Sequence, residues 1–268
     1  MTSDGHAGAL VRRWRTRRHR SQLDVAVSAG ISTRHLSYVE TGRSTPSRAM
    51  IERICDELDV PLRDRNEIYL AAGLAPAHRE RPLTDLGPAR AAVDAVLAGH
   101  EPNPAVAVNV RWDVLAANRA MQRFLADLPP ALAGPPLNVL RATLHPEGLA
   151  RRLRDGARWR AGLLRRVRRQ HERVGDPALA ELLAELGSYP PPPGGDGDGA
   201  ADDIAVPLRL AVDGGELSFL YTVTVFGSPR DVTLDEIAVE TFFPADDATR
   251  EALAALAGRW VPAGQAPT

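Results

Sequence analysis

A short run of hydrogen-bonding side chains, residues 33–38, is the part of the sequence whose residue types most directly suggest chemistry. At helical spacing Leu36 and Val39 fall on one side of the run, and polar residues fall on the other: Thr33, Arg34, His35, Ser37 and Tyr38. Such a face can donate hydrogen bonds to base edges in the DNA major groove, where each base pair presents a distinct pattern. The run therefore predicts a helix that reads bases.

Two short helices joined by a tight turn are expected to position this face. The first spans about 21–28, with its inward side formed by Leu23, Val25 and Ala26. Gly30 suits the turn because a residue without Cβ takes a positive φ at no steric cost. Ser32 stands where an N-cap belongs, so its hydroxyl is expected to accept a hydrogen bond from the helix over about 33–40.

Residues on either side of this pair are expected to contact the DNA backbone. Gln22, Arg43 and Ser47 are predicted to contact the phosphates and so position the protein on the DNA, together with amides at helix N-termini. Ser32 is a further predicted DNA contact. A helix over 10–20 carries six arginines and no acid, which favours further phosphate contacts over a merely solvated basic face.

Five helices are expected within residues 9–74, which form one all-α DNA-binding domain. Ser47 is predicted to cap a helix over 48–58, and a further helix runs from Pro61 to about Ala72. Residues 1–8 are expected to be disordered, and 75–82 has the composition of a linker. The single cysteine, Cys55, is interpreted as a buried core thiol and excludes an intramolecular disulfide.

The run S-Q-x-x-x-A-x-x-A-G-I-S-x-x-x-L-S-x-x-E-x-G-R-x-x-P-S, residues 21–47, resembles the Cro/repressor type of helix-turn-helix, the XRE family. Many positions agree in order and spacing, so the resemblance is specific. Val25 departs from the small residue or leucine that the family often has there, which affects packing rather than docking. The resemblance implies double-stranded DNA as a partner, read by a homodimer on a palindromic operator.

Residues 83–262 predict a second domain with about five antiparallel strands and helices inserted between the second and third. The longest helix is expected over 156–174. The strands are expected over 105–110, 112–116, 204–212, 216–226 and 236–243. With helices over one face, this describes a PAS-like sheet. The fold class is α+β in two domains.

Two stretches of this domain, N-x-x-W-D-V-L-A-A-N at 109–118 and the run at 224–246, resemble the MmyB-like ligand-binding domain found behind such helix-turn-helix modules. The resemblance covers about residues 83–258. It implies a transcription regulator, and it implies a fatty-acid-like effector. No other cofactor is predicted.

Apolar residues of this domain could enclose a pocket, or could simply fill a core. The candidate pocket residues come from the expected helices and strands: Phe124, Leu140, Leu144, Trp159, Leu163, Phe219, Tyr221 and Phe242. Arg111 and Arg141 are candidates to receive a carboxylate at the mouth. Glu240 is expected on the outward side of its strand, solvated or paired with an arginine.

Charge is distributed unevenly along the chain, in which all 33 cationic residues are arginine. Residues 1–82 hold 14 arginines against 10 acids, and residues 83–268 hold 19 against 24. A basic N-terminal part on an acidic body fits nucleic-acid binding by one end only. Residues 150–173 hold ten arginines and two acids, interpreted as the outer face of an amphipathic helix or as a second contact surface.

Signatures of catalysis and metal binding are missing from the sequence. His171-Glu172 is not followed by the second histidine of H-E-x-x-H, and no G-x-S-x-G, P-loop or G-x-G-x-x-G is present. The acidic stretch near 188–203 lacks the spacing of a calcium loop and is predicted to be disordered. An enzyme and a metal protein are therefore not expected. Without a signal peptide or membrane span, the location is expected to be cytoplasmic.

The leading hypothesis is a sequence-specific transcription regulator whose C-terminal domain binds a small apolar effector. The alternative is a DNA-binding protein whose C-terminal domain has a filled core and serves only dimerisation or partner binding. An enclosed apolar cavity would favour the first hypothesis, and a tightly filled core the second.

Overall fold

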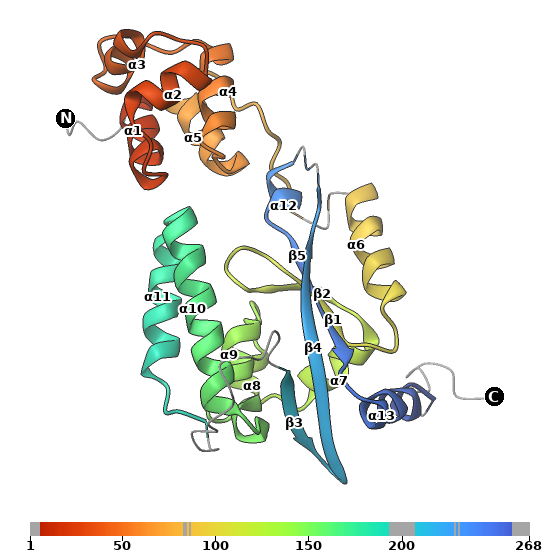
Figure 1. Cartoon of the computed structure of the whole chain (residues 1–268). Helices are drawn as coiled ribbons and strands as arrows, with labels where there is room; N and C mark the ends of the chain where they lie inside the picture. The colour runs from red at the N-terminus through yellow and green to blue at the C-terminus, as the bar shows by residue number, and fades with distance from the viewer. Residues whose placement is uncertain are drawn as a thin grey trace. The chain divides into compact units, whose positions relative to one another are not determined.

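The computed structural model of the chain (Figure 1) describes residues 6–82, 85, 87–192, 207–227, 229 and 231–258. The chain divides into two compact units. One contains Met1–Pro82, Glu172–Val174 and Gly227–Asp235, and the other contains the remaining residues. No helix in the described ranges is long and apolar enough to cross a membrane.

The first unit contains the five expected helices. They are α1 (Ala7–Arg17), α2 (Gln22–Ser28), α3 (Thr33–Glu40), α4 (Arg48–Glu57) and α5 (Leu62–Ala71). Their apolar sides meet in one core, which includes fully buried Val11, Trp14, Leu36, Ile51 and Ile54. The predicted all-α domain is confirmed, and each expected helix ends within a few residues of its predicted bounds.

Helix α1 begins earlier than the sequence pattern indicated. His6 is its N-cap, and its ring accepts a hydrogen bond from the amide of Ala9. Ala7 and Gly8 are buried, so residues 6–8 are folded rather than disordered, and residues 1–5 lie outside the described ranges. A Cβ on Gly8 would lie 1.8 Å from the carbonyl oxygen of Val39, so only glycine lets α1 approach the C-terminal end of α3 this closely.

Leu23 was expected to face inward and does not, because its side chain is 60% exposed. Val25 and Ala26 are fully buried and occupy the side of α2 that packs in the core. A helix of only seven residues presents one narrow side to its neighbours, and Leu23 lies off that side. Leu70 of α5 is exposed for 61% of its surface in the same way.

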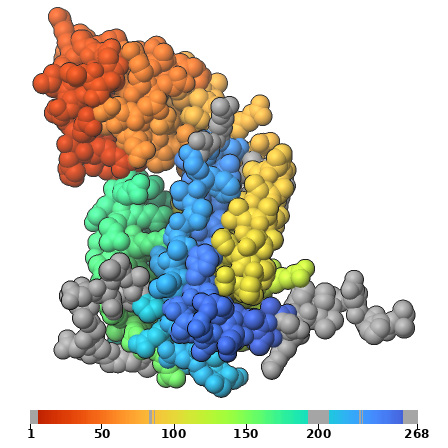
Figure 2. Space-filling model, turned by 45° about the vertical axis from the view of Figure 1, so that its right-hand side comes forward, coloured from red at the N-terminus to blue at the C-terminus, as the bar shows by residue number. Residues whose placement is uncertain are grey.

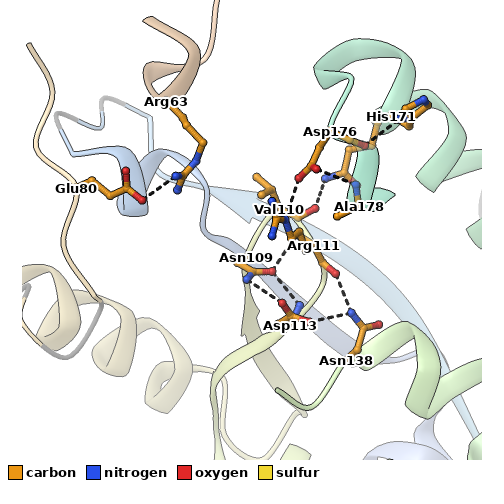
Figure 3. Close-up of polar contacts among 11 residues, drawn as sticks. Arg63, Glu80, Asn109, Val110, Arg111, Asp113, Asn138, His171, Asp176 and Ala178 are labelled. Atoms are coloured by element: carbon orange, nitrogen blue, oxygen red, sulfur yellow. Dashed lines mark hydrogen bonds and ion pairs between the residues drawn. The ribbon is translucent and has the colours of Figure 1, made fainter. Parts of the chain in front are cut away.

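Residues 75–82, expected to be a linker, are held against the helices of the first unit. The Asn66 side chain bonds His78 twice, donating to its carbonyl at 2.8 Å and accepting from its amide at 3.0 Å. Arg48 donates to the carbonyl of Ala75 at 2.7 Å, and Arg63 pairs with Glu80 at 2.7 Å (Figure 3). This segment is therefore an ordered extension of the first unit.

The second unit is built on a five-stranded antiparallel sheet in the order β2-β1-β5-β4-β3. The strands are β1 (Ala105–Val108), β2 (Val114–Ala117), β3 (Leu208–Val212), β4 (Gly215–Val225) and β5 (Ala238–Pro244). In the central pair Tyr221 lies opposite Phe242, and Val223 lies opposite Glu240. Val106 of β1 lies opposite Glu240 on the other side of β5, so these side chains share one face.

Helices cover both faces of this sheet, although only one covered face was expected. Helix α6 (Pro88–Gly99) contacts β1 and β2, and α13 (Asp247–Gly258) contacts β4 and β5. These two helices lie on one side of the sheet, and α9 (Val139–Leu144) and α10 (Gly156–Val174) lie on the other (Figure 1). Figure 2 shows α6 in yellow and α13 in dark blue together on their side. The remaining helices are α7 (Arg119–Ala126), α8 (Pro130–Ala133), α11 (Pro177–Ser188) and α12 (Val232–Asp235).

Strand β1 is buried along its whole length because it is covered on both faces, so it lacks an exposed side. The segments 193–206 and 259–268 lie outside the described residues, and most of the expected loop near 188–203 falls in the first of them.

Cys55 is confirmed as a free, fully buried thiol of the first core. Burial raises the pKa of this thiol to about 12, so the reactive thiolate is essentially absent at neutral pH. We expect iodoacetamide to leave Cys55 unmodified in the folded protein and to alkylate it fully in denaturant, as read by intact mass. Rapid labelling without denaturant would contradict its placement in the core.

Candidate functional site

Local capping places the face of α3. Ser32 is the N-cap, and its hydroxyl accepts from the amide of His35 at 3.1 Å. Gly30 takes a φ of +64° in the preceding turn, as the sequence predicted. Ser21 and Asp24 form a capping box at the start of α2, so both helices of the pair have fixed first turns.

The outward side of α3 carries one compact cation cluster around Tyr38. Arg34 donates from Nε to the Tyr38 hydroxyl at 2.9 Å, and its guanidinium lies 5.3 Å from the Tyr38 ring centroid. The Arg43 guanidinium lies 6.0 Å from the same ring. Arg34 and Arg43 are exposed, and Tyr38 is half-buried. The cluster presents two guanidinium groups at a surface.

Three other predicted contact residues are exposed as well: Ser32, His35 and Ser47. His35 Nε2 lies 3.5 Å from the Ser44 hydroxyl. The Ser47 hydroxyl accepts from the amide of Met50 at 3.4 Å and so caps α4. Thr33 and Ser37 are half-buried. Each of these residues remains a predicted DNA contact.

Gln22 is bound within the protein, through a network that fixes α1, α2 and α3 together. Glu40 has a nearly completely buried side chain, and Arg15 donates to both of its oxygens, at 2.6 and 2.9 Å. Gln22 Nε2 donates to the same carboxylate at 2.8 Å. The hydrogen bonds that Arg15 donates to the Glu40 carboxylate hold the pKa of Arg15 above its usual value. The network sets the angle at which α3 presents its outer face.

Several arginines of residues 10–20, in α1 and just after it, have protein partners and are not free cations. Arg15 binds Glu40, Arg18 donates to the carbonyl of Leu58 at 2.8 Å, and Arg20 pairs with Glu57 at 2.6 Å. Arg12 is exposed. The structure therefore assigns part of this arginine run to helix packing, and the expected row of phosphate contacts is shorter than the charge count suggested.

In the second unit, the predicted pocket residues meet in one apolar pocket between α7, α9, α10 and the sheet. Every candidate except Leu144 lines it, and Leu144 is buried in the surrounding core. Tyr221 and Phe242 stack at 5.9 Å, and Trp159 meets Tyr221 edge-on at 5.6 Å. The cavity volume is about 50 Å³, which exceeds the roughly 10–15 Å³ that one water needs.

Glu240 lines this pocket, so the expected outward, solvated position is wrong, whereas the alternative that it pairs with an arginine is what the structure has. It is 4% exposed, and Arg166 Nη1 donates to its Oε1 at 2.9 Å. The Arg166 guanidinium also lies over the rings of Trp112 and Tyr221, at 4.4 and 5.2 Å. Burial raises the pKa of Glu240, and Arg166 opposes that rise. Strand alternation predicted that a charged side chain such as Glu240 faces solvent. Glu240 instead lies on the face of β5 that borders the pocket, where it is buried.

The two arginines suggested for the pocket mouth are paired elsewhere. Arg111 donates to Asp176 at 2.9 Å, and Arg141 binds both oxygens of Glu185, with a closest distance of 2.7 Å. Neither lines the pocket. Arg166 is the arginine that lies beside the pocket, where it binds Glu240. It is one of ten arginines within residues 150–173, and nothing in the local sequence distinguishes it from the others.

The N-x-x-W-D sequence forms a tight turn between β1 and β2 (Figure 3). Asn109 Oδ1 accepts from the amides of Arg111 and Asp113, each at 2.9 Å. Asn138 Nδ2 donates to the Arg111 carbonyl at 2.8 Å and to Asp113 Oδ1 at 3.0 Å. Trp112 therefore lies in a turn, with φ +69°, and not in the strand that alternation predicted.

Trp112 is anchored to α10 by Gln170. The indole N–H donates to Gln170 Oε1 at 2.8 Å, and Gln170 Nε2 donates to the Val110 carbonyl at 2.7 Å. Since Arg166 stacks on the same indole, the turn and the pocket share one packed cluster of side chains.

Two family models match this architecture. The model of the MmyB-like transcription regulator ligand binding domain matches residues 89–256, and a helix-turn-helix domain model matches residues 6–68. The chain belongs to the MmyB-like transcription regulators. It is thus a regulator with a DNA-binding helix-turn-helix domain and a domain for a small-molecule ligand. No curated protein matches it.

Neither matched family is a family of enzymes. Among the described residues, no group of three or more His, Cys, Asp or Glu side chains is placed to hold a metal ion. The outward side of α3 and the apolar pocket of the second unit are the two candidate sites described above.

Proposed function

We propose that this MmyB-like regulator binds a specific operator through α3 and senses a small apolar effector, fatty-acid-like in its hydrocarbon part, in the pocket of its second unit. The observation that carries the proposal is the cluster of Arg34, Tyr38 and Arg43 on the outward side of α3, with exposed guanidinium groups. The opposite side of α3 is fixed by its buried Glu40, which binds Arg15 of α1. A fixed helix with an exposed donor face is what major-groove reading requires. We further propose that it acts as a homodimer on a palindromic operator.

Arg34 is expected to read a base. Arg34→Ala should weaken binding to the best site selected from random DNA by about 1–3 kcal/mol, because a bidentate arginine–guanine contact is worth that much. Fluorescence anisotropy with the selected duplex and with a scrambled duplex measures the effect. An equal loss on both duplexes would make Arg34 a phosphate contact.

Arg53→Ala is the matched control for loss of one positive charge. Arg53 is exposed on α4, and its recorded hydrogen bond goes to the Ala49 carbonyl of its own helix. We expect this variant to bind the selected duplex nearly as tightly as the unchanged protein.

The alternative is that the second unit only mediates dimerisation or partner binding, and the narrow cavity of about 50 Å³ favours it. Native mass spectrometry, followed by denaturing extraction of the same sample, separates the two proposals. A small-molecule mass that leaves on denaturation supports sensing. A ligand-free protein whose melting temperature no apolar additive changes supports the interaction module.

A further inference from the structure

The second unit carries a concentration of positive charge of which the pocket uses only Arg166. Residues 83–268 hold 19 arginines and 24 acids, and ten of these arginines but only two of the acids fall within residues 150–173. The rest of 83–268 therefore holds nine arginines and 22 acids. An acidic part of the chain thus contains one strongly basic segment, most of which forms α10.

Two arginines of α10 are bound within the second unit. Arg166 pairs with buried Glu240 at 2.9 Å. Arg160 Nη2 donates to the carbonyl of Gly187 at 2.8 Å, at the end of α11. Both guanidinium groups have structural partners, so they belong to the packing of the fold.

Three other arginines of α10, Arg165, Arg168 and Arg169, are exposed. A helix turns by about 100° per residue, so these positions fall within one sector of about 100°. The buried residues Leu163 and Val167 lie on the opposite side of the helix. Within the described residues, none of the three guanidinium groups forms a hydrogen bond or an ion pair.

The spacing of these exposed charges works against the helix that carries them. Like charges three or four residues apart on a helix repel one another, and Arg165 has that spacing to both Arg168 and Arg169. Glu172 follows at the same spacing, but no ion pair joins it to these arginines within the described part of the chain. A partner with several negative charges would remove this repulsion.

Double-stranded DNA fits this surface better than an acidic protein does. The chain has a helix-turn-helix domain, so DNA is a polyanion that this protein already binds. Guanidinium groups match phosphate oxygens through paired N–H donors. Phosphate contacts carry no sequence information and require no shaped pocket, so a row of exposed arginines is sufficient for them.

We propose that the exposed side of α10, formed by Arg165, Arg168 and Arg169, is a second DNA-binding surface that contacts phosphates of the bound duplex. This inference rests on the proposed operator binding and adds a sequence-independent contribution from the unit that contains the pocket. A change within that unit can then alter the affinity for DNA.

Arg165→Gln combined with Arg169→Gln tests the proposal in the full chain, since glutamine favours the helix and removes two positive charges. Affinity for DNA should fall at least about tenfold at roughly 0.1 M salt. The plot of log affinity against log salt concentration should become shallower by about 1.8 per bound chain, because each phosphate contact contributes about 0.9. Fluorescence anisotropy from about 50 to about 200 mM salt measures both quantities.

The loss should be the same on the selected duplex and on a scrambled duplex, because phosphates do not differ between them. A loss confined to the selected duplex would make these arginines base contacts and would overturn the phosphate assignment.

Arg90→Gln combined with Arg250→Gln is the matched control for net charge. Both arginines lie in the second unit, on α6 and α13, which cover the other side of the sheet (Figure 1). Each pairs with an acid of its own helix, Asp94 and Asp247 respectively. This variant should keep the salt dependence of the unchanged protein. Both double variants should also keep its melting temperature, since surface substitutions of this kind change stability little.

The outcomes distinguish this inference from the operator binding on which it rests. Equal salt dependence of the α10 variant and its control overturns the second surface, which would then fit an acidic protein instead. Reading by α3 stands in that case if the unchanged protein prefers the selected duplex. A shallower salt dependence of the α10 variant, with no preference among duplexes by the unchanged protein, supports the second surface and overturns sequence reading.

Discussion

Glu40→Ala is expected to lower the free energy of unfolding of the DNA-binding unit by about 3–5 kcal/mol, because removal of one partner leaves the other charge buried and unpaired. Arg15 and Gln22 both donate to this carboxylate. Hydrogen exchange measured on peptides from α1 and α3 reports the loss for this unit alone. Operator binding should fall with it, since α3 is positioned by the same network.

Glu57→Ala is the control for Glu40→Ala. Glu57 also pairs with an arginine, Arg20 at 2.6 Å, but both side chains are partly exposed, and such pairs contribute about 0–1 kcal/mol. Equal effects of the two replacements would contradict the account of Glu40 as a buried anchor. Combining Arg15→Met with Glu40→Leu should recover much of the stability, since an apolar pair needs no charge compensation.

Phe219→Ala is expected to lower the free energy of unfolding of the second unit by about 3–5 kcal/mol, the usual cost of truncating a buried phenylalanine. Phe219 is 1% exposed and meets Phe124 and Phe242 edge-on, at 6.1 and 6.3 Å. Because the residue lines the pocket, the replacement also enlarges it. Urea denaturation followed by hydrogen exchange of β4 and β5 peptides measures the loss.

Benzene should raise the melting temperature of Phe219→Ala and leave the unchanged protein nearly unaffected, because apolar cavities bind apolar molecules. Leu220→Ala is the control, since Leu220 is the next residue on β4 and is 41% exposed. A loss for Phe219→Ala no larger than that for Leu220→Ala would show that Phe219 is not part of a closed core.

Helix starts were predictable from the sequence because caps are local. Ser32 and Ser47 each accept from the amide three residues after the cap, in the predicted places. Asn118 and Asp246 make the same bond at the starts of α7 and α13. The helix-turn-helix and most strands follow from the same short-range patterns of spacing and turn residues.

Features that depend on tertiary contacts were not predictable in this way. The expected inward position of Leu23 and outward position of Glu240 followed from periodicity, which cannot tell how many faces are covered. The need for glycine at position 8 could not be predicted, because Gly8 lies in a helix and not in a turn. Its lack of a side chain matters only for the close contact with the Val39 carbonyl. Trp112 was predicted to lie in a strand. Its positive φ results from a turn that the hydrogen bonds of Asn109 stabilise, and the alternation of apolar residues does not reveal such a turn.

Arginine partners were the least predictable part of both sites. The sequence has 33 arginines and no lysine, so composition gives little reason to choose among them. Arg15 and Arg166 are distinguished only by the buried acids that they meet, Glu40 and Glu240. Pairing of this kind is decided by which helices and strands pack together.

Selection of DNA from random duplexes by the full chain tests the central claim, that this regulator reads sequence through α3, most directly. We predict one recurrent motif with two related half-sites, bound more weakly as salt is raised and altered at one position by Arg34→Ala. Enrichment of no motif above the input pool, with equal binding of all duplexes, would contradict sequence-specific reading.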